Sequence, residues 1–157
     1  MSFFYELLLS LHNIWRWVVL VLAIVAAATA LIGWFGKRQW GERDRKIGLF
    51  TAMSIDIQLL LGALLYIFSE YGIKGLSKGM EFVSANRDYR FFGLEHLVYM
   101  VVVVVLAHLG SILPRRAQES TKKFMRAAIP FTLMLLLIII GIPWWRPLLR
   151  VFGLTLP

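Results

Sequence analysis

The sequence has no cysteine among its 157 residues. That absence excludes disulfide bonds, thiolate metal sites, iron–sulfur clusters and covalently attached c-type haem. Charged residues are also scarce, at 17% against 59% hydrophobic residues. A soluble domain of this length needs more polar surface, whereas lipid can replace water around a membrane protein. The composition therefore predicts an integral membrane protein surrounded by the lipid bilayer.

Acidic residues are few as well, 9 against 17 lysines and arginines, so the net charge is +8. Such an excess can indicate nucleic-acid binding. Here, however, the basic residues gather in short segments between apolar runs, which is the pattern of membrane orientation. We therefore expect no nucleic-acid partner.

Four apolar runs are each long enough to cross the hydrocarbon core as a helix, which takes about 20 residues. They cover residues 11–35, 47–69, 91–113 and 125–145. The stretch before residue 11 is also mostly apolar, so the first helix could begin earlier. It has no basic residue before Arg16 and is too long for a cleaved signal peptide. Short connections make consecutive helices antiparallel neighbours, so we predict one all-α domain over 1–157, an up-down-up-down four-helix membrane bundle.

The distribution of basic residues predicts the orientation of this bundle. Segments 36–46 and 114–126, on one side, hold ten of the 17 basic residues. Segment 70–90 and the C-terminal tail, on the other side, hold six. The richer side is expected to be cytoplasmic, which places both termini outside.

Proline and glycine mark the ends of the predicted helices. Pro130 falls within the first two turns of the fourth run, where a missing amide does little harm, and Pro143 should kink or end that helix. The 70–90 segment is the longest polar stretch, and Met80 to Ala85 could form a short surface helix in it. This segment would be the lid over any cofactor at the outer end.

Two histidines, His12 and His96, lie near the same predicted end of two different helices. Ionisable side chains inside a membrane are costly and are functional candidates. Two neutral imidazoles on facing helices could bind a haem iron from both sides. Counting residues puts them at depths about 9 Å apart, a mismatch that helix tilt and uncertain boundaries could absorb. The pattern predicts a non-covalent haem b; the alternative is two hydrogen-bonded structural histidines.

Two arginines could accompany such a haem. Arg16 is four residues after His12 and shares its helix face, and Arg90 precedes His96. Either could pair with a haem propionate, although Arg16 could instead reach lipid phosphate. A zinc or copper site is less favoured, because His12, His96 and Glu95 supply at most three ligands.

Asp56 and His108 form a second polar pair, in the inner half of neighbouring helices. We predict that they approach closely enough for a direct or water-bridged contact. Such a pair could serve a proton path or a quinone site, since quinone reduction needs a proton. The alternative is a structural polar clip between helices, which Ser54 and Gln58 would suit equally well.

Several segments resemble a known family. They are LHNIWRW in the first helix, Asp44-Arg45-Lys46-Ile47-Gly48 before the second, QLLLGALLYIFS in it, RFFGLEH before the third, and GIPW at the end of the fourth. With them the chain resembles small four-helix bacterial membrane proteins often labelled cytochrome b. The resemblance covers most of the chain and implies a b-type cytochrome or an accessory subunit of the bacterial inner membrane. His12 and His96 match the family's histidines.

The first functional hypothesis is thus an electron-transfer protein with haem b, with quinone as a candidate partner, inside a larger respiratory or photosynthetic complex. The second is a structural or assembly subunit without a cofactor that holds other membrane protein subunits. A small transporter is the weakest, because four helices enclose little space and Asp56 is the only acid deep in the bilayer. The pattern identifies no catalytic residue, so a stand-alone enzyme is the less expected outcome.

Overall fold

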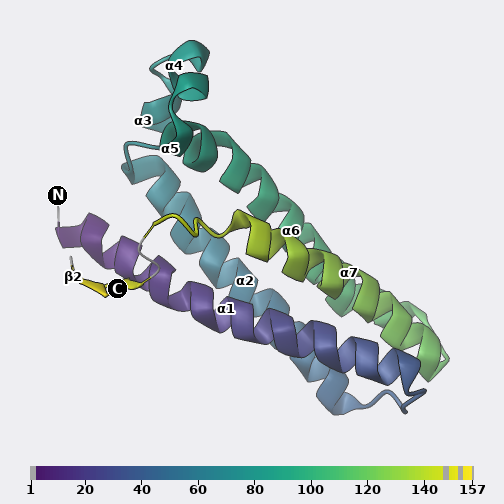
Figure 1. Cartoon of the computed structure of the whole chain (residues 1–157). Helices are drawn as coiled ribbons and strands as arrows, with labels where there is room; N and C mark the ends of the chain where they lie inside the picture. The colour runs from purple at the N-terminus through teal and green to yellow at the C-terminus, as the bar shows by residue number, and fades with distance from the viewer. Residues whose placement is uncertain (1–2, 147–148, 152–153, 157) are drawn as a thin grey trace.

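The computed structural model describes residues 3–146, 149–151 and 154–156. It consists mainly of long helices (Figure 1). Four helical stretches are long and apolar enough to cross a membrane. They are built from α1 (Phe3–Phe35), α2 (Glu42–Phe68), α6 (His96–Ile112) and α7 (Ser120–Gly141). The third stretch is longer than α6, because the short helices α5 (Arg87–Arg90), η1 (Phe91–Glu95) and η2 (Leu113–Arg116) extend it at both ends.

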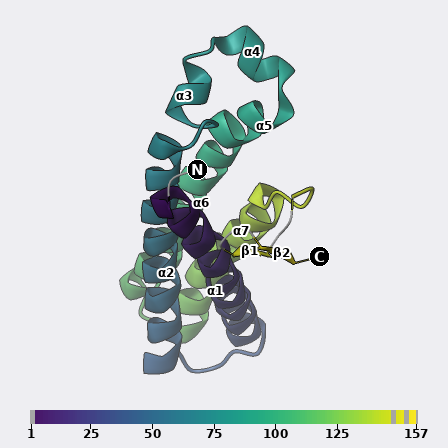
Figure 2. The same cartoon turned by 90° about the vertical axis from the view of Figure 1, so that its left-hand side faces the viewer.

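The long helices form an antiparallel bundle. α1 packs against α2 and α7, and α6 packs against the same two helices, so that the four close into a ring (Figures 1 and 2). Side chains from α1, α2, α6 and α7 make up one hydrophobic core. The predicted all-helical four-helix architecture is therefore confirmed for the main body of the chain.

The bundle is closely packed because small residues on α1 meet large ones on α7. Ala23, Ala27 and Ala30 on α1 are buried in the same core as Phe131 and Met134 of α7. On α6, a Cβ at Gly110 would lie only 2.5 Å from Cε1 of Phe131. The absence of a side chain there lets α6 approach α7 around that ring, as small residues do in membrane helix contacts.

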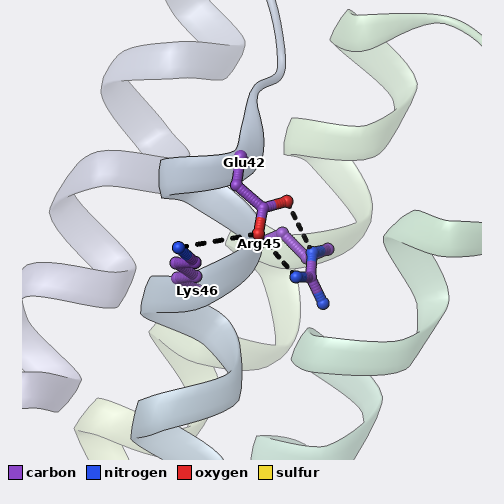
Figure 3. Close-up of polar contacts among 3 residues, drawn as sticks. All are labelled: Glu42, Arg45 and Lys46. Carbon is purple, nitrogen blue, oxygen red and sulfur yellow. Dashed lines mark hydrogen bonds and ion pairs between the residues drawn. The ribbon is translucent and has the colours of Figure 1, made fainter.

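The helix starts differ from the predicted boundaries. α2 begins at Glu42 instead of residue 47, because the Asp44 carboxylate accepts a hydrogen bond from the Gly41 amide at 2.9 Å and caps the helix. Glu42 binds Arg45 through two hydrogen bonds of 2.6 and 2.9 Å and lies 3.8 Å from Lys46 (Figure 3). Basic residues assigned to a loop are therefore in the first turns of α2. Likewise α7 begins at Ser120, not 125.

This earlier start changes the setting of Pro130. Since α7 begins at Ser120, Pro130 lies in the interior of the helix and is buried. The expectation that it sits within the first two turns is wrong, and its missing amide leaves a carbonyl one turn earlier without its usual donor. By contrast α7 ends at Gly141, just before Pro143, as predicted.

Residues 69–90, called here the cap segment, follow α2, and their last part, α5, begins the third apolar stretch (Arg87–Arg116), called here the third span. They contain α3 (Ile73–Leu76), the predicted α4 (Met80–Ala85) and α5, and stand beyond the end of the bundle (Figure 2). Tyr66 at the end of α2 donates a hydrogen bond of 2.9 Å to the Gly93 carbonyl in the π-helical η1. That bond ties the two sides of the cap segment together.

Strands are present after α7, which the all-α prediction does not include. β1 (Leu149–Val151) pairs antiparallel with β2 (Leu154–Leu156), with Leu149 opposite Leu156. β1 also contacts α1. Arg150, counted with the outer basic residues, lies in β1.

Candidate functional site

The structure brings His12 and His96 together in the bundle. Their ring centres lie 6.4 Å apart with an angle of 68° between the planes. They come from α1 and α6, which are diagonal to each other in the ring of helices. The predicted mismatch in depth shrinks because the third span continues to Arg116: the helical lengths below His12 and His96 become about 35 and about 30 Å.

His96 is oriented by the end of α7. Its Nδ1 lies 2.9 Å from the Gly141 carbonyl oxygen. A carbonyl can only accept, so Nδ1 carries the proton and Nε2 has a free lone pair. This is the arrangement by which a histidine that binds a metal through Nε2 is usually held.

His12 has the same tautomer, for a different reason. The Gln58 amide nitrogen lies 3.1 Å from the His12 carbonyl oxygen and 3.2 Å from its Nε2. The carbonyl oxygen requires a donor, which fixes the amide orientation, so Nε2 of His12 must accept. Its Nδ1 and the Gln58 Oε1 are both buried, with no hydrogen-bond partner among the described residues.

Aromatic side chains surround the His96 ring, whereas a glycine faces the His12 ring. Phe91 and Phe92 of η1 lie 5.5 and 6.0 Å from the His96 ring, centre to centre. On α2, a Cβ at Gly62 would lie 3.3 Å from Cε1 of His12. The absence of a side chain at Gly62 thus makes room for the imidazole.

Arg16 and Arg90, the two arginines predicted to accompany a haem, have different settings. Arg16 is buried on α1 one helical turn after His12, with its guanidinium 5.7 Å from the Trp17 ring centre. Arg90 binds the Glu95 carboxylate at 2.9 Å and the Ser84 carbonyl at 3.0 Å. Arg16 is therefore the arginine associated with the histidines.

Asp56 and His108 make the contact predicted for them. Asp56 Oδ1 lies 3.0 Å from His108 Nε2, and each side chain is 44% exposed. The pair joins α2 to α6 on the outside of the bundle.

Ser54 and Gln58 do not belong to this pair. The Ser54 carbonyl accepts a hydrogen bond from Trp15 at 2.9 Å, and Gln58 binds His12, so both face α1. Residues two positions apart on a helix point in different directions, which is why they could not share the Asp56 face.

A ligand set for zinc or copper is not assembled. Within the described residues no group of three or more histidine, aspartate or glutamate side chains is placed to hold a metal ion. Glu95, the third ligand considered, is engaged by Arg90 instead.

The separation of the two imidazoles is compatible with an iron between them. Each metal–nitrogen bond is about 2 Å and each nitrogen is about 1.1 Å from its ring centre, which gives about 6.2 Å between ring centres. The observed value is 6.4 Å. Ligation through Nε2 of His12 would require the Gln58 amide to turn away from that atom.

Sequence reasoning missed a cluster beside the cap segment, called here the C-terminal latch: Asp88, Trp145 and Arg146. Asp88 accepts hydrogen bonds from Trp145 Nε1, at 3.2 Å, and from the Arg146 guanidinium. The Arg146 guanidinium also lies over the Tyr71 and Phe92 rings, 4.8 Å from each centre. Its residues are too far apart in the chain for a local pattern to reveal it.

Comparison with known proteins adds no relative: no family model, curated protein or solved structure matches the chain. The resemblance to cytochrome b-like proteins stays a prediction from the sequence segments alone.

Proposed function

We propose that the chain is a b-type haem protein that transfers electrons in a bacterial inner membrane, as a subunit of a larger respiratory or photosynthetic complex. The observation that carries this proposal is the pair His12 and His96. Their rings lie 6.4 Å apart on diagonal helices. Both have the tautomer with the proton on Nδ1, so Nε2 carries the lone pair that a metal would need; on His12 that lone pair now accepts from the Gln58 amide at 3.2 Å.

Each residue near the pair has a role in this proposal. The Gly141 carbonyl holds the His96 ring by its Nδ1 proton, and Gln58 releases Nε2 of His12 by rotating its amide. The buried Arg16 would compensate a propionate. When bound, the haem would supply one-electron oxidation and reduction.

The Asp56–His108 contact gives the proposal a candidate quinone or proton site. A carboxylate and an imidazole at 3.0 Å can pass a proton between them. Because both side chains are 44% exposed at the outside of the bundle, a quinone dissolved in the membrane could reach them without entering the core.

An optical spectrum of the purified protein tests the proposal. We expect a Soret band that shifts on reduction with dithionite. His12→Ala and His96→Ala should each abolish the band or convert it to a high-spin form, because each removes one axial ligand. His108→Ala is the matched control and should leave the spectrum unchanged. A colourless protein, or a band that survives loss of both His12 and His96, would refute the haem assignment.

A structural subunit without a cofactor is the second candidate. The hydrogen bond from Gln58 to His12 joins α2 to α1, and the bond from His96 to Gly141 joins α6 to α7, without any ligand. In that case His12→Ala would lower the thermal stability of a colourless protein.

A further inference from the structure

An open cavity of about 280 Å³ lies between the start of the third span and the end of α7. Its polar wall is formed by Arg87, Arg90 and Glu95, and its apolar wall includes Phe91, Ile140 and Trp145. Tyr99 completes the lining. Neither imidazole lines this cavity, although the Phe91 ring in its wall lies 5.5 Å from the His96 ring, centre to centre.

The charges in this cavity are not balanced. The carboxylate of Glu95 is taken by Arg90, and that of Asp88 binds Arg146 and Trp145. Within the described residues, the Arg87 side chain makes no hydrogen bond or ion pair, although its charge also acts on Asp88. Its guanidinium instead stacks on Trp145, 3.9 Å from the ring centre. Stacking fixes the plane of the guanidinium and leaves its edge free to bind an anion.

The apolar side of the cavity continues along α7. Ile140, Leu136 and Leu133 share one face of that helix and are 57%, 52% and 48% exposed. Trp144 and Trp145 at the end of α7 are also exposed, as aromatic residues at a membrane interface are. A ligand that fits both parts has an anionic head and a long hydrocarbon tail.

We propose that this cavity binds the phosphate of an anionic phospholipid, with Arg87 as the principal contact and the acyl chain along Ile140 and Leu136. The inference rests on insertion of the bundle in a membrane but not on haem binding. Arginine pairs with phosphate through two parallel hydrogen bonds, and Trp145 would shield that pair from water.

The test uses the whole chain in nanodiscs of phosphatidylcholine that contain some phosphatidylglycerol. The protein is then extracted in detergent, and native mass spectrometry measures which lipid it retains. Wild-type protein should retain phosphatidylglycerol in preference to phosphatidylcholine. Arg87→Gln should weaken that retention about tenfold, the size expected for one charge-assisted hydrogen-bonded pair. Arg87→Lys, which keeps the charge, should recover part of it.

Arg115→Gln, at the opposite end of the bundle, removes the same charge from an exposed position and should retain the lipid. Equal losses in Arg87→Gln and Arg115→Gln would overturn the proposal, because they would indicate general surface attraction. The proposal would also be overturned if inorganic phosphate raised the melting temperature in a way that depends on Arg87, while phosphatidylglycerol left the melting temperature unchanged. The Soret band is measured on the same samples, so failure of the haem proposal is scored separately.

Discussion

Gln58 determines the tautomer of His12. Its amide also donates a hydrogen bond to Nε2, the nitrogen through which His12 would bind a metal. Its amide donates both to the His12 carbonyl and to Nε2. The bond to the carbonyl stabilises the contact between α1 and α2, whereas the bond to Nε2 competes with ligation. The effect of replacing Gln58 therefore distinguishes the haem protein from the structural subunit without a cofactor.

Replacing this side chain gives a direct prediction. Gln58→Ala should keep at least as much haem as wild type, because Nε2 of His12 loses a competing donor. The free energy of unfolding should fall by about 1 kcal/mol, the usual worth of one hydrogen bond. Heat denaturation and the Soret absorbance per protein measure the two effects.

Trp15→Phe is the control, since it removes a different hydrogen bond between α1 and α2, to the Ser54 carbonyl. It should lower stability without changing the haem content. Loss of the Soret band in a folded Gln58→Ala protein would contradict ligation through Nε2.

The Asp56–His108 contact should contribute little to stability. Its side chains are half exposed, and hydrogen bonds between membrane helices are worth about 0.6 kcal/mol on average. A double-mutant cycle with Asp56→Asn and His108→Ala should thus give a coupling energy below about 1 kcal/mol. Unfolding in mixed micelles measures it.

In the companion cycle, Asp56→Asn with His96→Ala should show no coupling, because His96 is bound to α7 instead. The spectrum of any bound haem should be unchanged in Asp56→Asn. A coupling energy of several kcal/mol between Asp56 and His108 would contradict this prediction and would indicate that another protein subunit buries the contact.

Among the residues, contacts between whole helix faces could be predicted and contacts of individual atoms could not. The similar depth of Asp56 and His108 predicts their contact, and the shared helix end of His12 and His96 predicts theirs. Gln58 is two residues from Asp56 and therefore lies on a different face of α2, against α1, which the polar character of the sequence around Asp56 does not reveal. The hydrogen bond between His96 and the Gly141 carbonyl could not be predicted, because every residue has a backbone carbonyl and the sequence does not show which one a side chain will meet.

For the helices, existence follows from apolar length, but the ends follow from local polar chemistry. Four runs of about 20 apolar residues predict four spans, and the structure has four helical stretches long and apolar enough to cross a membrane. α2 and α7 nevertheless begin within charged sequence, since exposed helix turns tolerate Glu42, Arg45 and Lys122. Hydropathy alone does not identify these charged first turns. It therefore starts the fourth helix too late and puts Pro130 too close to its beginning.

The C-terminal latch connects the end of α7 to the cap segment, next to the Gly141 carbonyl that holds His96. Asp88→Asn removes the charge that binds Arg146 and should loosen this end. We expect the amides of residues 142–146 to exchange with solvent about tenfold faster, as for loss of a charge-assisted hydrogen bond. Hydrogen–deuterium exchange with peptide mass spectrometry measures it.

Glu119→Gln is the matched control for that change. Glu119 pairs with Lys122 at the opposite end of the bundle, and both side chains are more than half exposed, so its loss should have little effect. Unchanged exchange in Asp88→Asn would show that the latch does not hold the end of α7.

For the whole molecule, the antiparallel ring of helices puts the 36–41 and 117–119 connections at one end and the cap segment at the other. Gln39 and Trp40 both contact the Ser120 hydroxyl, at 3.1 Å each. Most basic residues lie at this end, which predicts a cytoplasmic location for it. Because the chain has no cysteine, a single introduced thiol reports on one site without background.

Gln118→Cys should therefore resist a membrane-impermeant maleimide in intact cells and react once the membrane is opened. Ser77→Cys, in the cap segment, is the matched variant and should react in intact cells, because that end is predicted to face outward. Both positions are exposed, so a difference in labelling reflects the side of the membrane and not burial. The reverse pattern would invert the orientation and put the imidazole end of the bundle, with its C-terminal latch and arginine-lined cavity, on the cytoplasmic side.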